Sequence, residues 1–154
     1  MAVAPVPSLP RLIEQRVALH PDRIAVVFKG RGVSYGSLDR QANAIARQLR
    51  RAGVGRNTRV GLHVERSVAM VAAMLAIHKV GGAYVPLDPA FPRERLDDIV
   101  ADSGLQVLVH GGPVHLAAPP PFCIDVFASD DGPADAGPVA AQLDPHDLAY
   151  VMYT

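Results

Sequence analysis

The chain has 154 residues, of which 49% are hydrophobic and 19% are charged, and 15 basic and 15 acidic side chains give it a formal net charge of +0. This length and composition are those of one globular domain with a substantial hydrophobic core. A net charge of zero gives no electrostatic support to a nucleic-acid partner or to an anionic membrane surface, so we expect neither.

The single cysteine, Cys123, has no second cysteine in the chain with which to form a disulfide. A lone cysteine is consistent with the reducing cytoplasm, which is the location that we expect. The chain opens without the basic segment and apolar core of a secretion signal, and we interpret residues 1–8 as a flexible leader. The longest apolar run, residues 68–80, is too short to span a bilayer.

Apolar spacing and turn residues predict a helix followed by a β-hairpin at the start of the chain. Apolar residues at helical spacing within residues 9–19 predict a short amphipathic helix, which the His-Pro-Asp sequence at 20–22 ends. The β-branched run 24–28, the glycine-rich turn 29–32 and the returning run 33–35 predict the hairpin.

A long amphipathic helix is predicted over residues 36–51. The residues that share its apolar face are Leu38, Ala42, Ile45 and Leu49. Ser34 is a candidate N-cap, because a serine hydroxyl before a helix can accept a hydrogen bond from a backbone N–H of the first turn. Gly53 follows the last periodic residue and is expected to end the helix.

From residue 60 onward, apolar strands alternate with helices. The predicted strands are residues 60–64, 83–85 and 106–109, and the predicted helices are residues 68–80 and a helix marked by Leu96, Ile99 and Val100 that Gly104 ends. Because the first of these helices lacks a polar face, we expect it to be among the most buried elements. The alternation predicts an α/β fold, with a mostly parallel sheet and flanking helices.

Residues 110–143 break this alternation. Clusters of glycine and proline, such as Asp131-Gly132-Pro133, make this stretch mostly irregular, with one candidate strand at residues 122–126. Residues 144–147 then form a predicted turn, and residues 148–153 form a predicted final strand.

The most specific pattern in the chain is HKVGGAYVPLDPAFPRERL, at residues 78–96. It predicts a helix end at Gly81-Gly82, where glycine permits positive φ, then a short strand and a rigid turn in which Pro92 opens the next helix. The string resembles the second core motif of adenylation domains from nonribosomal peptide synthetases. Residues 33–49 resemble the first core motif of that family, and LAYVMYT at residues 148–154 resembles the opening of its third.

The resemblance implies that residues 9–154 are a partial N-terminal subdomain of an adenylate-forming, AMP-binding enzyme, truncated at the start of the phosphate-binding loop. In that family the third motif continues into a Ser/Thr/Gly-rich loop that ends in Pro-Lys-Gly. Thr154 matches the first residue of this ATP phosphate loop. The implied reaction is ATP-dependent activation of an amino acid to an aminoacyl adenylate, followed by transfer to a carrier-protein thiol.

The implied cofactors are ATP and Mg²⁺ in the complete domain, and phosphopantetheine on the carrier protein. The implied partners are the remainder of the adenylation domain, the carrier protein and the amino acid. Thr154 is the one cofactor-binding candidate in the chain, and we assign neither a catalytic residue nor a metal ligand. We therefore expect this part of the domain to be inactive when isolated.

Six other polar or aromatic positions have simpler interpretations. His110 and His115 flank a Gly-Pro loop, but two histidines without a carboxylate or cysteine partner make a poor metal site. Tyr84 is expected to pack on the sheet, and Asp88 to order the turn that follows. The histidines of the apolar stretches, at positions 63 and 78, are expected to be core or boundary residues.

Three other interpretations stay open. Acyl-CoA and aryl-acid ligases share the fold and the adenylate chemistry, although residues 84–88 and 92–96 favour the peptide-synthetase branch. A non-catalytic remnant would use the folded scaffold as an interaction module. An unrelated small nucleotide binder is the third, for which the chain contains no complete phosphate loop. The activated amino acid is not predicted, because the specificity pocket of the family lies beyond these residues.

Overall fold

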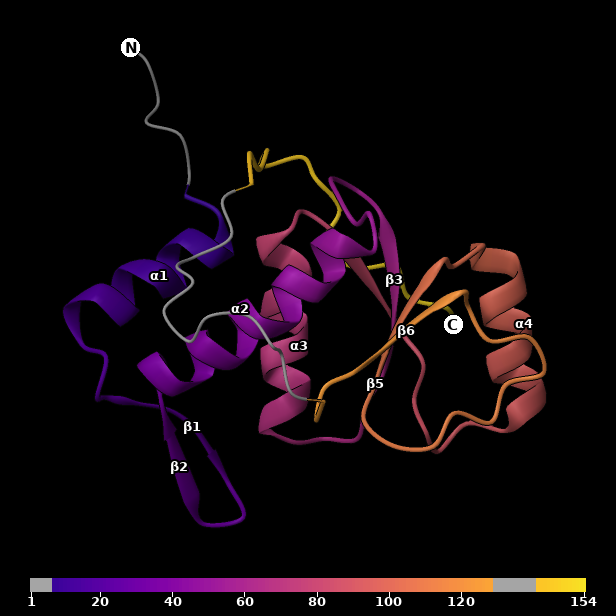
Figure 1. Cartoon of the computed structure of the whole chain (residues 1–154), viewed down its shortest axis with the longest axis horizontal. Coiled ribbons are helices and arrows are strands. Elements are labelled where there is room, and N and C mark those ends of the chain that lie inside the picture. The colour runs from indigo at the N-terminus through magenta and orange to yellow at the C-terminus, as the bar shows by residue number, and fades with distance from the viewer. Residues whose placement is uncertain (1–6, 129–140) are drawn as a thin grey trace.

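The computed structural model describes residues 7–128 and 141–154, and Figure 1 shows how their elements are arranged. The helices are α1 (Leu9–Leu19), α2 (Tyr35–Arg51), α3 (Val68–Lys79) and α4 (Arg93–Ser103). The strands are β1 (Ile24–Phe28), β2 (Arg31–Ser34), β3 (Arg59–His63), β4 (Ala83–Pro86), β5 (Val107–His110) and β6 (Phe122–Asp125). The predicted turn at residues 131–133 lies outside the described residues, as does the predicted leader, except for Pro7 and Ser8.

A parallel sheet of four strands, in the order β4-β3-β5-β6, forms the centre of the fold. Val60 of β3 lies opposite Tyr84 on one side and Val107 on the other. Successive side chains of a strand point to opposite faces. Val107 and Val109 therefore pack with α2 and α3, whereas Leu108 packs with α4. Helices thus cover both faces of the sheet (Figure 1), which confirms the predicted α/β fold.

The strands β1 and β2 form a separate antiparallel hairpin. Lys29 and Gly30 are its two turn residues, with φ of 49° and 76°, and Phe28 pairs with Arg31 across them. Two-residue turns with positive φ match the natural twist of paired strands. The predicted hairpin is confirmed, but its second strand begins at Arg31 rather than Val33, because the turn is shorter than expected.

The ends of the helices follow the predicted signals closely. The hydroxyl of Ser34 accepts the N–H of Ser37 at 3.2 Å and caps α2. Gly81 and Gly104, which follow α3 and α4, have φ of 84° and 62°. Pro92 differs slightly from its prediction, because it is the N-cap of α4 rather than a residue of its first turn.

Half of the residues of helix α3 are buried and only Val71 is exposed, so α3 is among the most buried helices, as predicted from its lack of a polar face. Leu75 is 6% exposed, and Met74 is half-buried. The fully buried alanines of the α2–α3 core are Ala42, Ala46, Ala72, Ala73 and Ala76. Such small side chains let neighbouring helix backbones approach closely. Although α3 is strongly apolar, none of the helices in the described ranges is long and apolar enough to cross a membrane.

Lys79, the last residue of α3, has a side chain with 0% exposure. Its Nζ lies 2.8 Å from Oε1 of Glu14 in α1 and 2.8 Å from Oδ1 of Asp39 in α2. Asn43 donates from Nδ2 to the second carboxylate oxygen of Asp39, at 3.2 Å. Since a buried ammonium group is stable only with such partners, Lys79 ties α1 and α2 to the end of α3.

The predicted final strand at residues 148–153 is wrong as a strand. This stretch makes one isolated parallel bridge, between Tyr150 and Tyr84 of β4. Two backbone hydrogen bonds, of 3.2 and 3.0 Å, join the N–H and C=O of Tyr84 to it. The next residue of β4 that faces this stretch is Pro86, which has no N–H to donate. The ladder therefore stops after a single bridge.

Replacing the buried lysine tests its structural role. In Lys79→Met the carboxylate of Asp39, only 13% exposed, loses its cationic partner. We expect a loss of about 3 kcal/mol in the free energy of unfolding, as when one partner of a buried ion pair is removed. Urea unfolding followed by circular dichroism measures it. The matched control is Lys29→Met in the exposed hairpin turn, and equal unfolding midpoints for the two variants would contradict the assigned role.

Candidate functional site

The segment of residues 144–154 lies along β4 and leads to Thr154. Because its bridge to β4 is parallel, Thr154 lies toward the carboxyl end of the sheet. In open parallel sheets, ligands bind outside the carboxyl ends of the strands. Contacts at the base, the middle and the end of the 144–154 segment fix where Thr154 lies.

At the base, Asp147 binds the loop that precedes β3. Arg56 donates to it from two nitrogens, Nε to Oδ2 at 3.0 Å and Nη2 to Oδ1 at 2.6 Å. Asn57 donates from Nδ2 to Asp147 Oδ1 at 3.3 Å and accepts the N–H of Leu148 at 2.7 Å. The N–H of Asp144 donates to Asp147 Oδ2 at 2.8 Å. The three side chains of Arg56, Asn57 and Asp147 are termed the clamp.

The loop that presents Arg56 and Asn57 depends on two residues with positive φ. Asn57 has φ of 57°, a region that asparagine tolerates better than most residues. Its N–H donates to the carbonyl of Gly81 at 2.8 Å. Gly81 has φ of 84°, and a Cβ there would lie 3.2 Å from the Cα of Arg56. The glycine that ends α3 therefore also leaves space for the clamp loop.

The clamp residues stabilise one another in their charged forms. The hydrogen bond to Asp147 raises the pKa of the Arg56 guanidinium above its ordinary value. Hydrogen bonds from Arg56 and from the N–H of Asp144 lower the pKa of Asp147 below its ordinary value. The backbone N–H and ring of His146 lower the pKa of Asp144 in the same way. The base of the segment is therefore ionised at neutral pH.

In its middle, the segment contacts two aromatic side chains, His78 of α3 and Tyr84 of β4. The carbonyl of Ala149 lies 3.0 Å from Nε2 of His78 and also accepts the N–H of Tyr84 at 3.2 Å. Because a carbonyl oxygen only accepts, His78 must carry a proton on Nε2. The ring of Tyr84 lies 5.5 Å from that of His78 and 5.7 Å from that of Tyr150. Burial, followed by the charge of Tyr150, raises the pKa of the Tyr84 hydroxyl.

At the end, Thr154 is exposed and lines a shallow pocket of about 360 Å³. The hydroxyl of Tyr153 donates to Oδ2 of Asp102 at 2.6 Å, and this bond raises the pKa of Tyr153. The charged residues of the pocket are Arg95, Asp98 and Asp102. Two carboxylates beside one guanidinium do not favour a phosphate group. Thr154 therefore lies toward the carboxyl edge of the sheet, but its neighbours here do not form a phosphate site.

The residues present also do not fit a magnesium site. Within residues 7–128 and 141–154, no three His, Cys, Asp or Glu side chains gather closely enough to hold a metal ion. Mg²⁺ requires near-octahedral oxygen ligands, usually with one or two carboxylates and substrate phosphates. These residues alone therefore do not form a binding site for the ATP and Mg²⁺ that the resemblance implies.

The other polar residues singled out in the sequence have local roles. Nδ1 of His63 donates to the carbonyl of Leu87 at 2.8 Å and so holds the turn after β4. Asp88 accepts the N–H of Ala90 at 2.9 Å, which orders that turn as expected. Nδ1 of His110 lies 2.9 Å from the carbonyl of Gly112, within its own loop.

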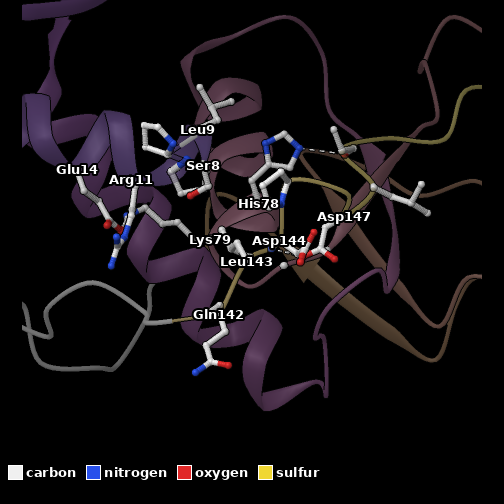
Figure 2. A pocket seen from close by; sticks show the side chains of 18 residues that line it. Ser8, Leu9, Arg11, Glu14, His78, Lys79, Gln142, Leu143, Asp144 and Asp147 are labelled. Atoms are coloured by element: carbon white, nitrogen blue, oxygen red, sulfur yellow. Dashed lines mark hydrogen bonds and ion pairs between the residues drawn. The ribbon is translucent and has the colours of Figure 1, made fainter. Parts of the chain in front are cut away.

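A larger cavity of about 890 Å³ lies between α1, the end of α3 and the base of the 144–154 segment (Figure 2). Figure 2 shows Lys79 directed toward Glu14 on one side of it, and Asp144 and Asp147 close together on the other. Lys79 is neutralised by its carboxylates, and Asp147 is paired with Arg56. These charges are therefore committed to holding the fold.

The clamp is the feature that the sequence did not reveal. Asp147 was assigned only to a turn, and Arg56 and Asn57 to no role. A weak signal exists, since Asn57 stands in a Gly-Arg-Asn-Thr loop before a strand, where asparagine suits positive φ. Its partner Asp147 is 90 residues away, and one sequence does not identify such a pair.

A parallel sheet with helices on both faces, and with a hydroxyl residue at its carboxyl edge, defines an α/β protein of the kind that binds ligands at that edge. Residues 13–154 match the family model described as AMP-binding enzyme. The match covers nearly the whole chain, so the chain belongs to the AMP-binding enzyme family. This confirms the resemblance carried by the three motifs.

The chain is similar to short parts of large synthases. It is 43% identical to chondramide synthase cmdD of Chondromyces crocatus over an alignment of 149 residues that covers 92% of this chain and 4% of that protein. It is 38% identical to tyrocidine synthase 3 of Brevibacillus parabrevis over an alignment of 152 residues that covers 96% of this chain and 2% of that protein. The chain thus spans only a small fraction of the relatives that it matches.

Solved structures give the same result for the fold. The AMPPNP-bound form of the nonribosomal peptide synthetase FmoA3 matches 99% of this chain with a TM-score of 0.87 and 30% identity, over 17% of its own chain. The N-terminal subdomain of NpsA from Klebsiella oxytoca matches 77% of this chain with a TM-score of 0.68 and 23% identity, over 30% of its own chain. The predicted likeness to an N-terminal subdomain of this fold is confirmed.

Acid should weaken the clamp. The ordinary pKa of an aspartate is 3.8, and that of Asp147 is lower in the folded chain. Between the two values the unfolded chain binds more protons, so stability falls as the pH is lowered through this interval. The contribution of Asp147 is complete above about pH 4 and is lost once the pH falls through the native pKa.

We therefore expect Asp147→Asn to lose less stability than the parent chain as the pH is lowered below about 4, although it is less stable at pH 7. Urea unfolding at each pH measures the difference. The control is Asp98→Asn, which changes an exposed carboxylate of α4. Identical acid dependence in Asp147→Asn and the parent chain would exclude the assigned pKa shift.

Proposed function

We propose that residues 9–154 are the N-terminal part of an adenylation domain of a nonribosomal peptide synthetase. The observation that carries the proposal is the match of nearly all of this chain to the AMPPNP-bound form of FmoA3. The similarity to chondramide and tyrocidine synthases supports the peptide-synthetase branch over the acyl-CoA and aryl-acid ligases.

In the proposed reaction, a carboxylate oxygen of an amino acid attacks the α-phosphorus of ATP, and pyrophosphate leaves. The product is an aminoacyl adenylate, which then passes its acyl group to the phosphopantetheine thiol of a carrier protein, with release of AMP. In the complete domain, Mg²⁺ would offset the negative charge of the phosphates. We place this activity in the cytoplasm, with the remainder of the domain, the amino acid and a carrier protein as partners.

The contribution of this chain to the reaction is to position the start of a phosphate loop. Among the described residues, only the stretch around Tyr150 bridges to the outer edge of β4. Thr154 follows this stretch and lies at the carboxyl end of the sheet. We propose that its hydroxyl donates to the phosphates of ATP when the rest of the loop is present. The loop residues that complete such a site, a Ser/Thr/Gly-rich sequence ending in Pro-Lys-Gly, are expected to follow it.

Amino-acid-dependent exchange of pyrophosphate into ATP tests the function. We expect the full-length protein to catalyse it with one or a few amino acids and residues 1–154 alone to show none, because both walls of a site are needed to align two reactants. Aryl or fatty acids that support exchange while all amino acids fail would indicate a ligase. If neither amino acids nor aryl or fatty acids support exchange, the interpretation of the chain as a non-catalytic interaction module would remain.

Substitution of Thr154 tests its proposed role in the full-length protein. Loss of one hydrogen bond to a charged phosphate in Thr154→Ala should reduce the rate of exchange by roughly tenfold or more. Thr154→Ser keeps the hydroxyl and should retain most of the rate. The KM for the amino acid should change little in both variants. Equal rates for the alanine and serine variants would show that the hydroxyl has no such role.

A further inference from the structure

We propose that the clamp of Arg56, Asn57 and Asp147 is a positioning device for nucleotide chemistry. It sets the register of residues 148–153 along β4, and thereby places Thr154 at the carboxyl edge of the sheet. Its effect on catalysis rests on the proposed function of the chain, whereas its effect on register does not.

The pairing with β4 is too short to set the register by itself. It consists of two backbone hydrogen bonds around Tyr84, and Pro86 prevents the next one. A slip by one residue would exchange the two faces of the segment. Val151 and Tyr153 now pack against the α4 core, whereas the alternate residues are largely exposed. Those exposed residues are Leu148, Tyr150 and Met152.

The clamp holds the segment at the residue where its extended part begins. Asn57 binds two consecutive residues, the side chain of Asp147 and the N–H of Leu148. Such a pair of bonds fits only one residue position, so it specifies the register. Each residue of an extended chain spans about 3.3 Å, and a slip by one residue would therefore displace Thr154 by about that distance.

The clamp is itself attached to the centre of the fold. The N–H of Asn57 donates to Gly81, and the loop continues directly into β3. The same turn after α3 leads into β4. The turn therefore holds both the clamp and the strand along which residues 148–153 lie. The bridge at Tyr84 and the clamp both tie the position of Thr154 to the sheet, beside the bonds that His78 and Asp102 make to the same segment.

The two ends of the ion pair are unequal. The side chain of Asp147 is 11% exposed, and that of Arg56 is 53% exposed. Both oxygens of Asp147 accept hydrogen bonds, from Arg56, Asn57 and the N–H of Asp144. Loss of the carboxylate therefore releases three partners at once, whereas loss of the guanidinium leaves two of them. Asp147 should be the more sensitive position.

The experiment compares variants of the full-length protein. The clamp variants are Asp147→Ala, Asp147→Asn and Arg56→Ala. The control is Arg93→Ala, which removes a surface ion pair with Asp97 on α4, 3.5 Å long, and leaves the clamp intact. Hydrogen exchange by mass spectrometry reports on the amides of residues 148–153, and pyrophosphate exchange gives kcat and the KM values for ATP and for the amino acid.

In Asp147→Ala, we expect the amide hydrogens of residues 148–153 to exchange with solvent at least tenfold faster than in the parent protein. We also expect its KM for ATP to rise, or its kcat to fall, by roughly tenfold, because small displacements of a positioning group cost rate steeply. The KM for the amino acid should stay within about twofold, since the clamp acts on one side of the site. Arg56→Ala and Asp147→Asn should show smaller changes of the same kind, and Arg93→Ala none.

The outcomes separate the two proposals. Unchanged amide exchange in Asp147→Ala would overturn the clamp as a register device, whatever the enzyme assay shows. Faster amide exchange with unchanged kinetics, or with equal losses for ATP and the amino acid, would overturn its role in nucleotide chemistry. Absence of activity in the parent protein would overturn the proposed function, and amide exchange would still decide the register.

Discussion

The enclosure of one ammonium group, that of Lys79, is the interaction on which the rest of the structure depends. Its partners Glu14 and Asp39 come from two different helices, so a single side chain joins α1, α2 and α3. The two glycines that follow turn the chain into β4 and make room for the loop before β3. Residues 79–82 therefore connect the packing of the helices to the edge of the sheet.

Elements with a local cause were predictable from the sequence. The burial of α3 follows from its lack of a polar face, and the cap of α2 follows from the hydroxyl of Ser34. The stretch at residues 148–153 differs, because its own apolar pattern is that of a strand. Whether it pairs as one depends on the donors of its neighbour, and Pro86 of β4 lacks the N–H that would extend the ladder. A pattern within one segment contains no information about its partner's donors.

The candidate site shows the same difference between features with a local cause and features that depend on a distant partner. Thr154 could be proposed as a site residue from the sequence, because a motif of neighbouring residues marks it. The anchors of the segment were not, because Asp147 in a turn and Arg56 in a loop are ordinary polar residues when taken singly. They meet across 91 positions of sequence. Lys79 and Glu14, which are 65 positions apart, were missed for the same reason.

The proton that His78 carries on Nε2 has a consequence for how the segment would detach. The bond from Nε2 of His78 ends on the backbone carbonyl of Ala149, which is not an acidic group. The carboxylate of Asp147, in contrast, loses its charge when it takes up a proton. In acid the base of the segment is therefore released while its middle stays attached to α3. Acid therefore acts first on residues 144–148, while the contact at Ala149 continues to hold residues 149–153 against α3 and β4.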